Sequence, residues 1–227
     1  MTIELNSHFV AFIDLLGFSE MVREDCESAA EPKHVSRLYD AHLRAATTLG
    51  KDLESGLIQF SDSIVFSRPF DLTALDAFIA AVAAWQKSLL VDGLLCRGGV
   101  TFGKHFVKDR FMFSKGLIDA YRLESTHAKM PRIVISDDLL QLASTKVDLE
   151  KLKILREEDD VYFIDYLSAE SDYEITSLKT SVENVIYKTH GGASVKEKMR
   201  WLAHYADFKL GTKLSSPQFV PPPSSAV

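Results

Sequence analysis

The feature that most constrains this chain is an apolar run near its start that one acid interrupts. Residues 8–16 read HFVAFIDLL, with Asp14 inside the run. Such runs predict a strand buried on both faces, where a carboxylate is costly unless it binds something. Gly17 and Phe18 follow, and then Ser19 as the expected helix cap. The pattern predicts a strand that ends at a functional acid, with an N-cap or a buried Asp–Arg pair as the structural alternative.

A second acid lies in an expected tight turn. Residues 56–67 read GLIQFSDSIVFS, so two β-rich runs flank Asp62 and its two serine neighbours. This pattern predicts a hairpin, and turn chemistry alone would explain an Asp there. If the hairpin lies beside the first strand, Asp14 and Asp62 point at one spot. Two hard oxygen ligands of this kind suit Mg²⁺ or Mn²⁺ bound together with substrate phosphates.

The rest of the chain alternates helical and strand patterns up to about residue 170. Helices are expected up to Thr48 with an interruption near Pro32, and over 72–90, 115–126, 137–143, 181–189 and 194–209; strands over 94–102, 132–136 and 161–165, with a hairpin over 106–113. This order predicts an α+β sandwich with a mostly antiparallel central sheet covered by helices. We expect a catalytic domain over 1–170, a C-terminal helical extension packed on it over 171–214, and a disordered Pro- and Ser-rich tail over 215–227.

Composition restricts the possible partners and compartments. The 227 residues carry a net charge of -6, which argues against binding to nucleic acid. Cys26 and Cys96 are the only cysteines, so a disulfide framework is not expected. The sequence shows no signal peptide and no apolar stretch near the roughly 20 residues that span a bilayer. The seven histidines have no close metal-ligand spacing. A soluble, cytoplasmic protein without membrane contacts is the expectation.

Four segments, taken in order, resemble the motifs of class III nucleotidyl cyclases. They read FIDLLGFS (12–19), FSDSIVFS (60–67), CRGGVTFG (96–103) and KGLIDAYRLES (115–125). Four motifs in the family's order are more specific than any one of them. The resemblance implies the cyclase-like α+β sandwich and a nucleoside triphosphate substrate.

The resemblance also implies roles for single residues. Asp14 and Asp62 match the two metal-binding aspartates, and Leu15 matches a position that lends a backbone carbonyl, so two Mn²⁺ or Mg²⁺ ions per site are implied. Arg122 matches the arginine that stabilises charge on the α-phosphate, with an i,i+3 salt bridge to Asp119 as the structural alternative.

Two further implications concern the arginine on the third motif and the assembly. Arg97 would contact phosphates or brace a dimer. Class III sites form between two chains, so a homodimer with composite active sites is implied.

Departures from the family concern the base pocket. Ile58 and Phe113 occupy positions where adenylyl cyclases of the family have a lysine and an aspartate that read adenine, and Ile118 replaces an asparagine. Apolar side chains cannot hydrogen-bond a purine edge, so ATP is a poor candidate. Aromatic side chains could stack on the base instead, and the candidates are Phe12, Phe60 and Tyr121. Gly17 and Phe18 of the first motif are also expected to bind the nucleotide.

Because it lacks the side chains that hydrogen-bond a purine base, the chain is similar to the bacterial pyrimidine cyclases of the Pycsar antiphage system. That similarity implies a uridylate cyclase that converts UTP, or CTP, to a cyclic 3′,5′-monophosphate (cUMP or cCMP) and pyrophosphate. The product would signal to a downstream effector in antiviral defence. Two alternatives stay open: a degenerate cyclase-like module that senses a nucleotide, and a purine cyclase with an unusual pocket.

Overall fold

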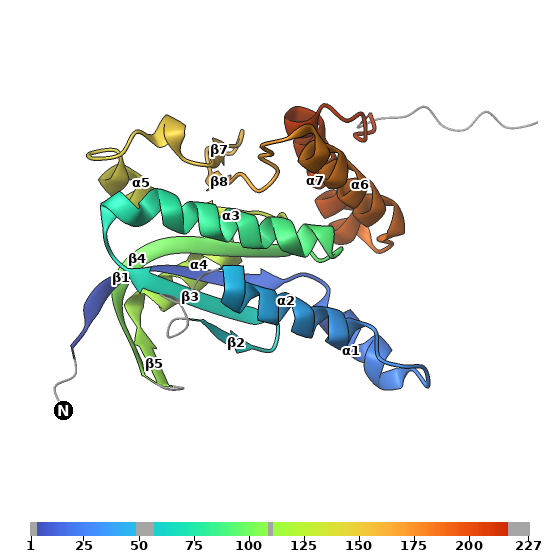
Figure 1. The fold of residues 1–227 in the computed structure, drawn as a ribbon, viewed down its shortest axis with the longest axis horizontal. Helices are drawn as coiled ribbons and strands as arrows, with labels where there is room; N and C mark the ends of the chain where they lie inside the picture. Colours follow the sequence, from blue (N-terminus) through green and yellow to red (C-terminus); the bar gives the residue numbers. More distant parts are fainter. Residues whose placement is uncertain (1–3, 49–56, 109–110, 218–227) are drawn as a thin grey trace, which may run out of the picture.

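A computed structural model describes residues 4–48, 57–108 and 111–217 (Figure 1). Its strands form one eight-stranded sheet in the order β2-β3-β1-β4-β6-β8-β7, with β5 paired to β4. The strands are β1 (Asn6–Leu15), β2 (Ile58–Phe60), β3 (Ser63–Pro69), β4 (Cys96–Lys108), β5 (Phe111–Ser114), β6 (Ile133–Ile135), β7 (Ile154–Arg156) and β8 (Tyr162–Ile164). All pairings are antiparallel except β4 with β6, so the predicted mostly antiparallel sheet is confirmed.

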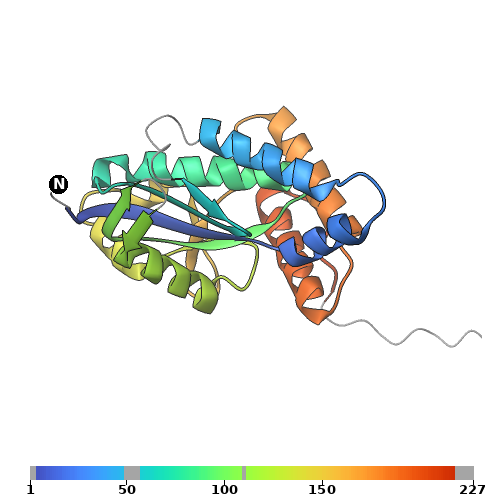
Figure 2. The same cartoon turned by 90° about the horizontal axis from the view of Figure 1, so that it is seen from below.

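Helices cover the sheet on both faces. They are α1 (Phe18–Glu27), α2 (His34–Thr48), α3 (Leu75–Val91), α4 (Lys115–His127), α5 (Asp137–Ala143), α6 (Asp172–Lys188) and α7 (Ala193–Leu210). Helices α2 and α3 lie on one face of the sheet and α4 on the other (Figure 2). The predicted α+β sandwich with two C-terminal helices is therefore confirmed.

Strand β1 lies between β3 and β4 and has two buried faces, as its apolar run predicts. Phe9, Ala11 and Ile13 join the main core with α3, because alternate side chains of a strand point to opposite faces. Val10 and Phe12 join a smaller cluster beneath α4.

Helix α4 lies directly on the backbone of β4. A Cβ atom at Gly99 would sit 2.5 Å from the carbonyl oxygen of Ala120, and one at Gly103 would sit 2.9 Å from the backbone nitrogen of Gly116. Only glycine allows so close an approach of helix and strand. This packing fixes which residues of α4 face the end of β1.

Several local expectations need correction. Helix α1 begins after Gly17, which has a positive φ of 78°, and not after Ser19. Strand β7 has no counterpart among the predicted elements, since it has only three residues and owes its place to pairing with β8. The predicted hairpin over 106–113 is confirmed by the pairing of β4 with β5, although its turn lies outside the described residues.

The C-terminal helices pack against the end of the sheet that carries β6 and β8. Leu178 and Val182 of α6 and Leu202 of α7 share a buried cluster with Val134 and Phe163. In Figure 1 the two helices lie at the C-terminal end of α3. The predicted boundaries at 170 and 214 stay predictions, because continuous packing does not mark a domain border.

One expectation about apolar stretches is wrong. Among the described residues, Leu72–Val91 is long and apolar enough to cross a membrane by length and composition alone. Phe78, Ile79, Val82 and Leu89 of this helix are buried in the main core. Core packing therefore accounts for its hydrophobicity.

Candidate functional site

The two acids singled out in the sequence lie at one end of the sheet. Strand β3 pairs with β1, and Asp14 is the register partner of Ser63, the residue after Asp62. The backbone N–H of Leu15 donates to the carbonyl of Asp62 at 3.0 Å. The hairpin therefore lies beside the first strand, which is the condition under which the two carboxylates converge.

Arg97 and Glu124 complete a charged cluster with Asp14. Arg97 is the β4 register partner of Asp14, and its Nε donates to Asp14 Oδ2 at 3.0 Å. Glu124 Oε1 lies 2.7 Å from the same Nε, and the Glu124 side chain is only 3% exposed. That oxygen has no hydrogen-bond partner, since the Nε–H points at Asp14. Two carboxylates thus compete for one N–H.

Electrostatics at this cluster favour a bound cation. Burial raises the pKa of Asp14; the hydrogen bond and charge of Arg97 lower it, and the neighbouring Asp62 raises it again. The pKa of Glu124 is also raised: burial raises it most, the charge of Arg97 lowers it, and the charges of Asp14 and Asp62 raise it further. Acids that repel one another in a half-buried site gain most from a nearby positive charge.

The donor set fits a hard divalent ion that keeps open positions. No group of three or more His, Cys, Asp or Glu side chains in the described part of the chain could hold a metal. Asp14 and Asp62 supply carboxylate oxygens, the donors that Mg²⁺ and Mn²⁺ prefer. An ion held here would take its remaining ligands from backbone, water or substrate phosphates, as magnesium commonly does.

Arg122 lines a cavity to which neither Asp14 nor Asp62 contributes. This cavity of about 630 Å³ is formed by β4, α4 and α5, and Lys104 and Lys115 also line it. Asp119 pairs with Lys115, so the salt bridge to Arg122 considered from the sequence does not form. Asp14 is absent from the lining of this cavity. Arg122 and Asp14 therefore do not line this cavity together.

The residues expected around the base lie in different surroundings. Phe12 is buried, and its ring meets Tyr121 edge to face at 5.4 Å. Phe60 and Phe113 are exposed, and Ile58 is half-buried opposite Val65. None of these residues lines the three cavities described by the structure. Their roles in base binding stay predictions, and stacking by Phe12 would require Tyr121 to move.

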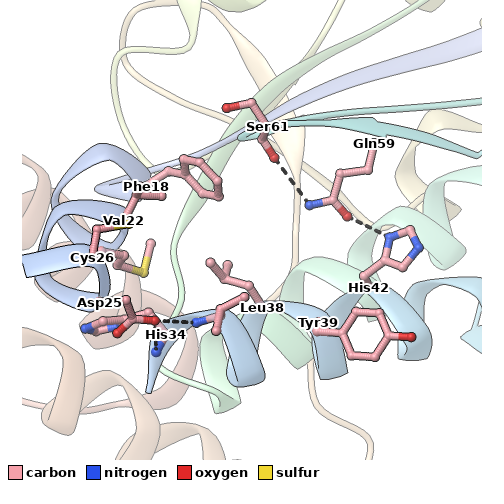
Figure 3. Close-up of a pocket in the computed structure, with 12 residues that line it drawn as sticks. Phe18, Val22, Asp25, Cys26, His34, Leu38, Tyr39, His42, Gln59 and Ser61 are labelled. Carbon is pink, nitrogen blue, oxygen red and sulfur yellow. Dashed lines mark hydrogen bonds between the residues drawn. The ribbon is translucent and has the colours of Figure 1, made fainter. Parts of the chain in front are cut away.

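A cavity of about 500 Å³ lies between α1, α2 and the β2–β3 hairpin, lined by Phe18 among others (Figure 3). Gln59 Oε1 accepts a hydrogen bond from His42 Nδ1 at 2.6 Å, and Gln59 Nε2 donates to the Ser61 carbonyl at 3.4 Å. Ser61 has a positive φ of 56°. These contacts connect α2 to the turn that carries Asp62, and Gly17 is the N-cap residue of α1.

Sequence reasoning missed Glu124, although a signal existed. Ala120 and Glu124 of α4 and its C-cap residue Ala128 are spaced by four residues and are all buried. An acid within the apolar stripe of a helix needs a partner. Read this way, Glu124 would have been paired with an arginine on the neighbouring strand.

No protein-family model and no curated protein sequence matches this chain. Among solved structures, the adenylyl cyclase CyaB from P. aeruginosa matches with a TM-score of 0.54 at 17% identity, over 77% of this chain and 99% of that chain. The guanylate cyclase domain of RhGC from Catenaria anguillulae, in complex with GTP, gives a TM-score of 0.49 at 15% identity, over 73% of this chain and 98% of that chain. The CyaB match shows that this chain has a class III nucleotidyl cyclase fold.

Proposed function

We propose that this chain is a metal-dependent pyrimidine nucleotide cyclase. It would convert UTP, or CTP, to the cyclic 3′,5′-monophosphate and pyrophosphate. The observation that carries the proposal is the pairing of β1 with β3, which sets Asp14 beside the Asp62 turn on a cyclase fold.

The chain's own residues would bind and orient the triphosphate. Asp14 and Asp62, with the Leu15 carbonyl, would hold two Mn²⁺ or Mg²⁺ ions. Such ions, when bound, favour loss of the 3′-hydroxyl proton and neutralise phosphate charge. The 3′-oxygen would then attack the α-phosphorus and displace pyrophosphate. Gly17 and Phe18, at the start of α1, would lie beside the phosphates.

Arg122 would act on the site of a partner copy. Its guanidinium suits charge on the α-phosphate, because its donors have a fixed geometry and its charge is permanent. Arg122 lines a cavity apart from Asp14, which is compatible with a homodimer whose two sites each take acids from one chain and Arg122 from the other. Under this proposal each composite site needs both chains.

The preference for a pyrimidine base would come from the absence of side chains that hydrogen-bond a purine. Ile58 and Phe113 offer no side-chain hydrogen bonds to a purine edge, and the exposed rings of Phe60 and Phe113 are available for stacking in a dimer. We propose UTP as the preferred substrate and CTP as the second. The cyclic product would act in the cytoplasm as a second messenger for an antiphage effector.

One experiment tests the reaction and the substrate together. Purified protein is incubated with each of the four ribonucleoside triphosphates plus Mn²⁺, and products are identified by mass spectrometry. Cyclic UMP or cyclic CMP is the expected product. Cyclic AMP or cyclic GMP as the main product would make the chain a purine cyclase.

A second candidate function is a nucleotide-sensing module without turnover. Two observations favour it: Arg97 already pairs with Asp14, and Ile118 stands exposed where the family has an asparagine. Saturable binding of a triphosphate with no product under the same conditions would establish this function.

A further inference from the structure

Arg97 has two acceptors and can satisfy only one of them with its Nε–H. It donates to Asp14 Oδ2 at 3.0 Å, while the buried Glu124 Oε1 lies 2.7 Å away with no hydrogen bond. A buried carboxylate oxygen without a donor keeps its desolvation penalty uncompensated. The Nε–H of Arg97 therefore has two alternative acceptors, Asp14 and Glu124, and the structure shows the bond to Asp14.

The second alternative needs only a small movement. If the Nε–H turned from Asp14 to Glu124, the orphaned oxygen would gain a charge-assisted hydrogen bond. Asp14 would lose its cation and would need another. The two acids lie on different elements, β1 and α4, and both elements are fixed on β4 by register pairing and by close packing at Gly99.

We propose that Arg97 serves as a stand-in cation for Asp14, and that Glu124 is a positioning residue that accepts Arg97 when a divalent ion takes its place. The inference rests on the proposed function, since it assumes that Asp14 binds the ion. Glu124 thereby lowers the cost of releasing Asp14, and it sets the affinity of the metal site without touching the metal.

The test is Mn²⁺ binding to the purified chain without nucleotide, with free Mn²⁺ measured by its electron paramagnetic resonance signal. Glu124→Gln keeps the shape but offers Arg97 a neutral acceptor, so Mn²⁺ should bind about tenfold more weakly, within the range of ordinary coupling energies. Asp119→Asn removes a charge elsewhere on α4 and should leave Mn²⁺ affinity unchanged. Unfolding curves confirm that each variant is folded.

The decisive comparison is a double-mutant cycle with Arg97→Gln. Without Arg97 no hydrogen bond can move from Asp14 to Glu124. Adding Glu124→Gln to this background should therefore cause no further loss of Mn²⁺ affinity. An equal loss in both backgrounds would mean that Glu124 attracts Mn²⁺ by its own charge and would overturn the proposal. Should Arg97→Gln not fold, Arg97→Met, which keeps an extended side chain without charge or N–H donors, replaces it in the cycle.

Asp14→Asn separates this inference from the function on which it rests. If Asp14→Asn binds Mn²⁺ as well as the native chain, the metal site itself is refuted. If Asp14→Asn abolishes binding and the cycle shows no coupling, only the exchange of Arg97 between the two acids is refuted.

Discussion

The backbone N–H of Leu15 donates to the backbone carbonyl of Asp62 at 3.0 Å, which joins the end of β1 to the β2–β3 turn. This bond does not depend on any side chain. Substitution of the Asp14 or Asp62 side chain should therefore leave this backbone hydrogen bond between the two segments in place.

Asp14→Ala and Asp62→Ala should each lower turnover by about 10³-fold or more, because a metal site is worth several kcal/mol to the transition state. Each variant should keep or exceed the native unfolding temperature, since removal of one acid relieves repulsion. Product formation and thermal unfolding are measured side by side. Near-native turnover in either variant would leave that aspartate with a structural role only.

Mixed dimers test whether Arg122 acts across chains. An Asp14→Ala chain and an Arg122→Ala chain should each be inactive alone. A random mixture should recover about a quarter of native activity, because half the dimers are mixed and one of their two sites is intact. Turnover is measured after the chains are unfolded and refolded together. No recovery, despite mixed dimers seen by native mass spectrometry, would mean that each chain holds its own complete site or that Arg122 has another role.

Base selectivity should follow Ile58 and Phe113. In equimolar competition the native chain should yield mainly cyclic UMP, then cyclic CMP, with little cyclic AMP. Ile58→Lys with Phe113→Asp should raise the share of cyclic AMP about tenfold or more, since hydrogen-bonding sites discriminate more strongly than apolar ones. Products are counted by mass spectrometry. Chiefly purine products from the native chain would contradict this prediction.

The approach of α4 to β4 should make Gly99 intolerant of any side chain. Gly99→Ala would place a methyl group 2.5 Å from the Ala120 carbonyl oxygen, so it should destabilise the fold by about 1–3 kcal/mol, as overpacking does. Gly192→Ala is the matched control, because nothing lies within 4 Å of its Cβ position. Urea unfolding compares the two. Equal stabilities would mean that α4 does not pack this closely.

His105 should make stability depend on pH. Its Nε2 lies 3.0 Å from Ser67 Oγ and its Nδ1 lies 2.8 Å from Ser114 Oγ, the N-cap of α4. Burial, and then the neighbouring His8, lower the pKa of His105 from 6.5 to about 4. The unfolded chain therefore binds the proton first, and stability is lost as pH falls from about 6.5 to 4.

The full loss from His105 corresponds to about 3 kcal/mol. His105→Asn should remove most of this pH dependence. Urea unfolding at pH 7 and pH 4.5 measures the difference between the two chains, which cancels contributions from other acids. An unchanged pH dependence in the variant would show that His105 titrates normally.

Local chemistry was enough to predict the elements that carry the two acids. The apolar run around Asp14 requires a strand buried on both faces, and the serines around Asp62 require a turn, because strand burial and turn geometry are encoded by neighbouring residues. The glycines at 98 and 99 likewise indicated a close backbone contact before its partner was known.

Tertiary structure alone decided how these elements meet. The parallel pairing of β4 with β6 and the three-residue strand β7 depend on distant partners, which leave no periodic pattern in the sequence. The competition of Asp14 and Glu124 for Arg97 joins residues from three separate segments. Arg122 precedes Glu124 by two residues in the chain, yet it lies on another face of α4, because a helix turns by about 100° per residue.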